Sequence, residues 1–257
     1  KGTRVMYSEY ERLNVTYPKA TNQKALGKRT AAAVRLVASR PKTMSILNRF
    51  RLDGKCALVT GASRGLGREI ALALADVGAE LILVARGEEA LESVAEEIDD
   101  AFGKRPVALA CDVGDPQQWE PALQETLAQH GPVDILVNNV GGRRMDVATE
   151  NVSLADWRQI IDLNLTSAFL ATRHVGAAMV ARGTGGRIIN IASISGLVAN
   201  RDIGGRAYET AKAALIHFTR ATAADWAPHG ITVNAICPGG FMTEPNQRWV
   251  KDNPAAI

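Results

Sequence analysis

The chain has 257 residues, of which 46% are hydrophobic and 22% are charged, a composition typical of a globular protein with a sizeable core. No apolar run reaches the length that spans a membrane, and the four histidines show no spacing suited to a metal ion. The three cysteines, Cys56, Cys111 and Cys237, are far apart in apolar surroundings, which favours buried thiols of an intracellular, cytoplasmic protein over a disulfide framework.

The first 43 residues differ from the rest of the chain. They hold ten Lys and Arg against two Glu, so residues 44–257 are mildly acidic and give no reason to expect nucleic-acid binding. A basic, acid-poor segment is typical of a targeting presequence, but translation that begins at Met44 is the interpretation we favour. Either way, we expect residues 1–43 to lie outside the fold and residues 44–257 to form a single domain.

From Arg51 onward, short apolar runs alternate with longer amphipathic ones. The apolar runs predict strands at Cys56–Val59, Leu81–Ala85, Val107–Ala110, Ile135–Asn138, Arg187–Ile191 and Thr232–Ile236. The amphipathic runs predict helices over 65–77, 88–101, 116–129 (with Asp115 as N-cap), about 154–180, and a last one that carries Tyr208.

This alternation defines the expected fold. Strands without polar alternation are buried on both faces, and strict strand–helix alternation implies right-handed crossovers. The sequence therefore predicts an α/β protein with a doubly wound parallel sheet, a three-layer α/β/α Rossmann fold. Because the chain stops at Ile257, shortly after the sixth predicted strand, we expect a last helix or lid and a closing strand to be missing.

A glycine-rich turn follows the first predicted strand and opens the first helix. It reads Thr60-Gly61-Ala62-Ser63-Arg64-Gly65-Leu66-Gly67. Glycines here permit close approach of the backbone to a pyrophosphate, and the helix N-terminus adds amide groups and a favourable dipole. A glycine pattern alone is weak evidence, but at the head of a strand–helix–strand series it predicts a dinucleotide site.

The residues after the second predicted strand indicate which nicotinamide cofactor is bound. An acidic residue there would bind the ribose 2′-hydroxyl of NAD and reject a 2′-phosphate. The chain instead has Arg86 and no carboxylate before Glu88, and Arg64 of the glycine-rich turn could reach the same phosphate. Two guanidinium groups favour NADP(H), although Arg86 as a solvated strand end is the alternative.

A tyrosine and a lysine lie four positions apart, at Tyr208 and Lys212. On a helix this spacing places both side chains on one face, one turn apart. A phenol is a poor proton donor or acceptor near neutral pH, since its usual pKa is about 10, but a close cation favours the phenolate. The pair could therefore act as an acid/base, although the same spacing also occurs as a plain surface contact.

The motifs together resemble the short-chain dehydrogenase/reductase family over about residues 50–245, and the chain is similar to its 3-oxoacyl-carrier-protein reductases and gluconate-type dehydrogenases. The residues that carry the resemblance, besides the glycine-rich turn, are Asp112-Val113, Asn138-Asn139-Val140-Gly141, Asn164, Ser193, Tyr208, Lys212 and Pro238-Gly239. Each motif is modest, but their ordered combination is specific.

The resemblance implies hydride transfer between a nicotinamide and a carbonyl or secondary alcohol. It implies that Tyr208 is the acid/base, that Lys212 favours its phenolate and binds the nicotinamide ribose, and that Ser193 stabilises charge on the substrate oxygen. Asn164 would hold a water that relays protons. The implied cofactor contacts, besides Tyr208 and Lys212, are Gly61, Ser63, Arg64, Gly65, Leu66, Gly67, Arg86, Asp112, Val113, Asn139, Gly141, Pro238, Gly239 and Thr243.

Two positions depart from the family pattern. Val140 stands where the family usually has alanine, a minor change in an apolar turn. Ser193 lies fifteen residues before Tyr208, two more than is usual, and counting back by the usual spacing selects Ser195 instead. Strand register favours Ser193, because loops absorb insertions more easily than strands do.

The substrate is less well defined. Arg143, Arg144, Arg201 and Arg206 could rim the site and attract an anionic substrate, or could be solvated loop charges. A 3-oxoacyl thioester and a sugar acid or polyol are the candidates that the resemblance suggests. It also implies a homodimer or homotetramer. The competing hypothesis is a catalytically silent dinucleotide-binding sensor or scaffold, which the presence of all four implied catalytic residues disfavours.

Overall fold

The structure, a computed structural model, describes residues 45–142, 145, 147–199, 205–244, 247 and 251. The predicted extension, residues 1–43, lies outside these ranges, as do Arg143, Arg144 and Arg201. A 3-10 helix, Ile46–Phe50, comes before the first strand. No helix within the described ranges is long and apolar enough to cross a membrane.

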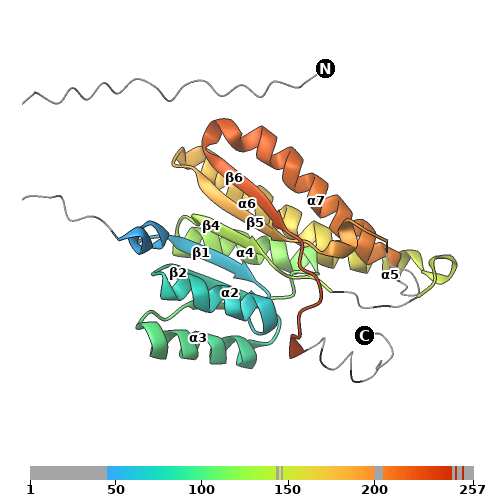
Figure 1. Cartoon of the computed structure of the whole chain (residues 1–257), viewed down its shortest axis with the longest axis horizontal. Helices are drawn as coiled ribbons and strands as arrows, with labels where there is room; N and C mark the ends of the chain where they lie inside the picture. Colours follow the sequence, from blue (N-terminus) through green and yellow to red (C-terminus); the bar gives the residue numbers. More distant parts are fainter. Residues whose placement is uncertain are drawn as a thin grey trace, which may run out of the picture. The chain divides into compact units, whose positions relative to one another are not determined.

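One sheet of parallel strands forms the centre of the fold, in the order β3-β2-β1-β4-β5-β6 (Figure 1). Every strand pair is parallel, as where Val59 of β1 lies opposite Leu83 of β2. The predicted doubly wound sheet is confirmed, and the predicted strand ends agree to within one residue. The strands are β1 (Cys56–Thr60), β2 (Glu80–Ala85), β3 (Val107–Ala110), β4 (Ile135–Asn138), β5 (Gly186–Ile191) and β6 (Ile231–Ile236).

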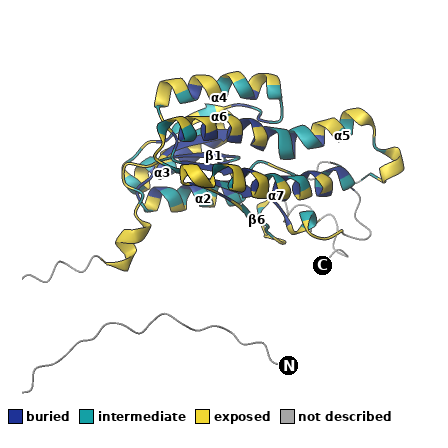
Figure 2. Ribbon diagram, turned by 90° about the horizontal axis from the view of Figure 1, so that it is seen from above, coloured by how far each residue is buried: buried dark blue, intermediate teal, exposed yellow. Residues whose placement is uncertain are grey.

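Helices cover both faces of the sheet. In Figure 2, α4 (Pro116–His130) and α6 (Ser167–Arg182) lie across the sheet from α2 (Gly65–Asp76) and α3 (Glu88–Phe102). The last long helix, α7 (Arg206–Trp226), packs on the same side as α6. Right-handed crossovers account for this division, since the chain moves outward from β1 to β3 and then returns to pass from β4 to β6. The N-cap of α4 was correctly predicted: the Asp115 carboxylate accepts from the N–H of Gln117 at 2.9 Å.

Successive residues of one strand enter different cores, which explains the continuous apolar runs. Ala57 and Val59 of β1 pack with α2 and α3, whereas Leu58 between them packs with α4 and α6. On the second side, Trp119 of α4 is fully buried and donates its indole N–H to the carbonyl oxygen of Ser167 at 3.1 Å. Both faces of the central strands β1, β2 and β4 are thus shielded from water, as in other parallel sheets.

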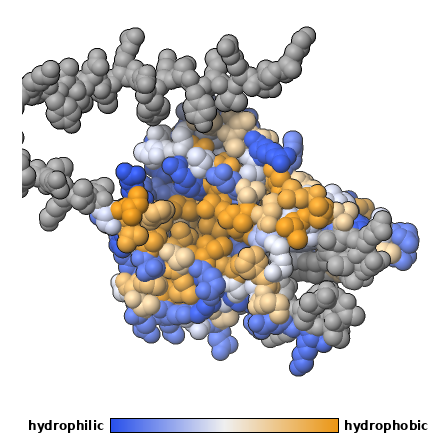
Figure 3. All heavy atoms as spheres, in the orientation of Figure 1, coloured by the Kyte–Doolittle hydropathy of each residue, from blue (hydrophilic) through white to orange (hydrophobic). Residues whose placement is uncertain are grey.

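Among the described residues, the last strand of the sheet, β6, is covered on one face only. Ile231 and Val233 are buried beneath α7, while Thr232 and Asn234 are exposed and Ile236 is 52% exposed. Figure 3 shows hydrophobic residues gathered over the middle of the face seen in Figure 1, where the strands are drawn. The carboxyl end of β6 therefore presents apolar side chains beside the site described below.

A buried series of hydrogen-bonded polar side chains connects strands β4 and β5 with helices α6 and α7. The amide of Asn138 (β4) donates to Thr172 Oγ1 (α6) at 3.1 Å and to Asn190 Oδ1 (β5) at 2.8 Å. The amide of Asn190 donates in turn to Thr219 Oγ1 (α7) at 2.9 Å. Because buried polar groups are costly to leave unpaired, these bonds fix α7 against the sheet.

Candidate active site

Tyr208 and Lys212 lie one turn apart near the start of α7. The Nζ atom of Lys212 is 5.9 Å from the centroid of the Tyr208 ring and donates a hydrogen bond to the carbonyl oxygen of Ile191 at 2.9 Å. Lys212 is 2% exposed, and this desolvation lowers its pKa to about 8, with the Cys237 thiol opposing the shift. The helix thus places a buried amine beside the tyrosine ring.

Asn164 lies in a π-helical turn, Asp162–Thr166, between α5 (Leu154–Ile161) and α6. Its amide donates to the carbonyl oxygens of Ile160 at 2.9 Å and Gly142 at 3.2 Å, and its Oδ1 accepts from the N–H of Gly142 at 2.9 Å. The predicted helix from about residue 154 to residue 180 is confirmed as helical throughout, with one π turn inside it that the sequence did not indicate. Such turns are frequent at functional sites.

Gly141 is the point at which Asn164 and Lys212 meet. A Cβ atom at residue 141 would lie 2.6 Å from Lys212 Nζ and 2.7 Å from Asn164 Oδ1. These distances leave no room for a side chain. The loop after β4, the π turn and α7 therefore converge, and the structure brings together three residues that the sequence places far apart.

Ser193 lies two residues beyond Ile191, the residue whose carbonyl accepts from Lys212. It is 8% exposed, and its Oγ accepts from the N–H of Ser195 at 3.1 Å, so that it caps the 3-10 turn η4 (Ile194–Gly196). The N–H of Ile194 donates to the carbonyl oxygen of Pro238 at 3.1 Å. Ser193 is thus held at the carboxyl end of β5, whereas Ser195 lies within the turn and is only half-buried.

The glycine-rich turn leaves space that side chains would fill. Gly61 and Gly65 have φ angles of +69° and +55°, which glycine adopts without steric cost. A Cβ atom on Gly67 would overlap the carbonyl oxygen of Gly61 and lie 2.5 Å from the Asn139 amide nitrogen. Because the N-terminus of α2 offers backbone N–H groups and a favourable dipole next to this turn, the turn could hold a pyrophosphate.

Asn139 supports the glycine-rich turn through the backbone. Its side-chain amide donates to the carbonyl oxygens of Thr60 at 3.0 Å and Gly61 at 3.3 Å. The hydroxyl of Thr60 in turn accepts from the N–H groups of Asn139 at 3.0 Å and Val140 at 3.2 Å. Sequence reasoning missed the part played by Thr60, although a hydroxyl at the end of an otherwise apolar strand was a usable signal.

Two arginines and an aspartate lie at the carboxyl ends of β1 to β3. Arg64 is exposed at the N-cap of α2, and the side chain of Arg86 is 57% exposed with its Nη1 3.9 Å from Asp112 Oδ2. Asp112 also accepts from the N–H of Gly114 at 3.0 Å, while Val113 is buried. Because β1 and β2 are neighbours, both arginines belong to the same edge of the sheet.

The segment after β6 runs from the serine turn to the glycine-rich turn. At one end of the segment, a Cβ atom on Gly239 would lie 3.8 Å from Ile194 Cδ1 of the serine turn. Farther along the chain, Thr243 Cγ2 lies 3.4 Å from the place that a Cβ atom on Gly65 would occupy in the glycine-rich turn. The predicted nicotinamide-side residues therefore link two turns that are more than a hundred residues apart in the sequence.

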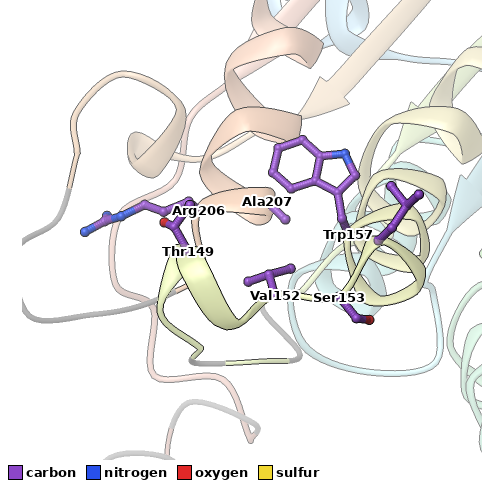
Figure 4. Close-up of a pocket in the computed structure, with 7 residues that line it drawn as sticks. Thr149, Val152, Ser153, Trp157, Arg206 and Ala207 are labelled. Atoms are coloured by element: carbon purple, nitrogen blue, oxygen red, sulfur yellow. The ribbon is translucent and has the colours of Figure 1, made fainter.

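A hollow of about 310 Å³ adjoins the start of α7. Figure 4 shows Trp157 and Ala207 next to each other on one side of it, Val152 on the opposite side, and Thr149 and Arg206 at one end. Arg206 forms an ion pair with Glu209 at 2.7 Å. The described residues that line this hollow do not include the four predicted catalytic residues. The hollow therefore lies next to the candidate site, since its lining residue Ala207 precedes Tyr208 in the chain.

The chain matches known proteins over most of its length. The family described as short chain dehydrogenase matches residues 55–254. Galactitol 2-dehydrogenase (L-tagatose-forming) of Cereibacter sphaeroides is 45% identical over 195 residues, 76% of this chain and 74% of that protein. The 3-oxoacyl-[acyl-carrier-protein] reductase of Escherichia coli is 41% identical over 209 residues, 81% of this chain and 82% of that protein.

A solved structure agrees with these matches. The gluconate 5-dehydrogenase of Burkholderia cenocepacia, in complex with NADP and tartrate, superposes with a TM-score of 0.73 at 37% identity, covering 81% of this chain and 80% of that one. The chain therefore belongs to the short-chain dehydrogenase family. It is an oxidoreductase of the class that uses a nicotinamide dinucleotide to act on small molecules.

Proposed function

We propose that the chain is an NADP(H)-dependent oxidoreductase that interconverts a carbonyl and a secondary alcohol, with Tyr208 as acid/base. The observation that carries the proposal is the convergence of Gly141, Asn164 and Lys212 beside the Tyr208 ring. This cluster lies at the carboxyl ends of β4 and β5, the edge at which open α/β sheets bind their ligands. A surface Tyr–Lys contact would not bury its lysine.

In the proposed reduction, each residue of the cluster has one task. Tyr208 donates its hydroxyl proton to the substrate oxygen, and the Lys212 ammonium stabilises the phenolate that remains. Ser193 donates a hydrogen bond to the same oxygen as negative charge develops there. Asn164 holds a water that returns a proton toward Lys212. The nicotinamide, when bound, supplies the hydride.

The proposed cofactor contacts lie at the glycine-rich turn and at the charged residues near it. Gly61, Ser63, Gly65, Leu66 and Gly67 would lie against the pyrophosphate, because the turn and the start of α2 offer backbone amides there. The remaining proposed contacts are those to the 2′-phosphate (Arg64, Arg86), to adenine (Asp112, Val113) and on the nicotinamide side (Asn139, Gly141, Tyr208, Lys212, Pro238, Gly239, Thr243). The NADP complex of the gluconate 5-dehydrogenase relative supports NADP.

The preference for NADPH can be tested at Arg86. We expect Arg86→Ala to lower the ratio of kcat/KM for NADPH to that for NADH on the order of 10- to 100-fold, because a hydrogen bond to a charged group is lost only with the phosphorylated cofactor. Arg105→Ala is the matched control, since Arg105 is similarly exposed and also paired with a carboxylate, Glu92. Steady-state kinetics with both cofactors measure the ratio, and a wild type that prefers NADH would contradict the assignment.

The substrate proposal rests on the relatives and is tested by a panel. We propose a 3-oxoacyl thioester or a sugar acid or polyol, since relatives named for both chemistries match this chain at 40% identity or more. NADPH oxidation against short 3-oxoacyl thioesters and keto sugars distinguishes the two. Binding of NADPH without turnover of either group would favour the alternative of a silent dinucleotide sensor or scaffold.

We further propose that the chain acts as a homodimer or homotetramer in the cytoplasm. Phe169 of α6 is 39% exposed and packs edge-on against Phe218 of α7, with ring centroids 6.1 Å apart. An exposed aromatic contact between two long helices supports a helix-mediated interface. The described cysteines are free, which supports a reducing compartment.

A further inference from the structure

The serine turn η4 rests directly on the backbone of α7 at the lysine. A Cβ atom on Gly196 would lie 2.7 Å from the carbonyl carbon of Lys212, 2.8 Å from the amide nitrogen of Ala213 and 2.9 Å from Ile216 Cδ1. Two of these three atoms belong to the helix backbone, which cannot move aside as a flexible side chain can. Even one methyl group at residue 196 would therefore separate the turn from the helix.

Gly196 is tied to Ser193 through the same turn. The N–H of Gly196 donates to the carbonyl oxygen of Ser193 at 2.9 Å. The N–H of Ser195 donates to the hydroxyl oxygen of Ser193 at 3.1 Å. A displacement of Gly196 is thus transmitted to Ser193 over three residues of a compact turn. On its other side, the turn is held by Ile194 N–H, which donates to the carbonyl oxygen of Pro238 at 3.1 Å.

The strand that leads into this turn also holds the lysine. Lys212 Nζ donates to the carbonyl oxygen of Ile191 at 2.9 Å, so a single short segment, residues 191–196, contacts α7 at both ends. One contact is made by the lysine side chain and the other by the lysine backbone. The separation between Ser193 and α7 is therefore set by how closely residue 196 approaches the helix.

We propose that Gly196 is a positioning residue whose missing side chain sets the distance between Ser193 and the Tyr208–Lys212 pair. The proposal rests on the proposed function, because it assigns Ser193 and Tyr208 to the same substrate oxygen. It adds that the separation of serine and tyrosine is fixed by backbone contact between η4 and α7. A residue larger than glycine at position 196 would misalign two donors that must reach one atom.

The test compares two glycine-to-alanine variants of the full chain. Gly196→Ala is expected to lower kcat about 10- to 100-fold, as small misplacements of reacting groups do, with the Kd for NADPH within about twofold of wild type. Gly186→Ala is the control: its new methyl group would overlap the side chain of Met179, an unbranched residue that can move. We expect the control to lose thermal stability without losing kcat.

Crystal structures of the two variants supply a readout that does not depend on turnover. We expect residue 196 to move away from Lys212 in Gly196→Ala and to stay in place in Gly186→Ala. An unmoved turn, or a moved turn with kcat equal to that of the control, would overturn the positioning role and leave the proposed function standing. A wild type without carbonyl turnover would overturn both, and the wild-type assay identifies that case.

A second variant covers the outcome in which Gly196→Ala does not fold. The double variant Gly196→Ala/Ile216→Val removes the Cδ1 atom that the new methyl group would meet, so that only the two backbone atoms of α7 still crowd it, at a further cost in stability of about 0.5–1.5 kcal/mol for the Ile-to-Val change. We expect kcat at least threefold lower with unchanged NADPH affinity. Wild-type kcat in this variant would count against the proposal.

Discussion

Replacement of Tyr208 by Phe is expected to lower kcat on the order of 10²- to 10⁴-fold, the usual contribution of a positioned acid or base. The phenylalanine keeps the ring that lies 5.9 Å from Lys212 Nζ and removes only the hydroxyl. NADPH affinity should therefore fall by no more than the loss of one hydrogen bond allows, about tenfold, which is less than the expected loss in kcat. Stopped-flow or steady-state NADPH oxidation measures the rate, and cofactor fluorescence measures binding.

The outcome that contradicts this prediction is a Phe variant within about tenfold of the wild-type rate, since a proton donor contributes at least about 100-fold. In that case another group protonates the substrate, and the burial of Lys212 beside the ring has a structural meaning only. Ser193→Ala and Ser195→Ala, measured alongside, separate the two serines. We expect the larger loss of kcat in Ser193→Ala, because Ser193 lies at the end of β5.

Replacement of Lys212 by Met is expected to reduce activity and to stabilise the fold. Burial lowers the pKa of Lys212 from its usual 10.5 to about 8, so at pH 7 the charge on this amine is less favourable in the folded protein than in the unfolded chain. At about 1.4 kcal/mol per pKa unit, the shift from 10.5 to about 8 corresponds to a cost of about 3–4 kcal/mol. Methionine removes that cost, while kcat falls with the loss of the ammonium.

The cost of burying the Lys212 charge depends on pH. Below about pH 8, Lys212 is charged in both folded and unfolded chains, and the cost of burying the charge is fully present. Between pH 8 and the unfolded value of 10.5, only the unfolded chain is charged, so the cost declines as pH rises. The stability advantage of Lys212→Met should therefore be largest at pH 7 and small above pH 10.5. Wild-type carbonyl reduction should also slow as pH rises through 8, because the ammonium is lost.

Urea unfolding of wild type and variant at pH 7 and pH 10 measures the difference. Lys104→Met is the matched control, because Lys104 also donates to a backbone carbonyl, that of Gly78 at 2.8 Å, but is only half-buried. We expect Lys104→Met to change both kcat and the free energy of unfolding by less than Lys212→Met does. A Lys212→Met protein less stable than wild type at pH 7 would show that the hydrogen bond to Ile191 outweighs the desolvation.

The sequence was sufficient for those parts of the fold that depend on local patterns. Buried strands such as Ile135–Asn138 are short apolar runs between turn signals, and their predicted bounds are those observed. Asp115 before Pro116 is a local N-cap signal, and its bond to the first turn of α4 is present. These features need only neighbouring residues, so one sequence contains the information.

Contacts between distant residues were not predictable in the same way. The π turn around Asn164 depends on the loop after β4, whose Gly142 bonds both to the amide nitrogen and to the oxygen of the side chain. The fit of Gly196 against Lys212, and of Gly141 between Lys212 and Asn164, depends on how strands and helices pack. A glycine in a sequence indicates freedom of the backbone, and only the fold shows what its missing side chain leaves room for.

The central claim is that hydride and proton reach the substrate at the Tyr208–Lys212 site, and isotope transfer tests it most directly. NADPH deuterated at nicotinamide C4 is mixed with the full chain and a short 3-oxoacyl thioester or keto sugar, and the product is examined by mass spectrometry and NMR. We expect deuterium on the new carbinol carbon with wild type, and an initial rate of deuterium incorporation at least about 100-fold lower with Tyr208→Phe. Tight NADPH binding with no deuterium in any product, or equal transfer by the Tyr208→Phe protein, would contradict it.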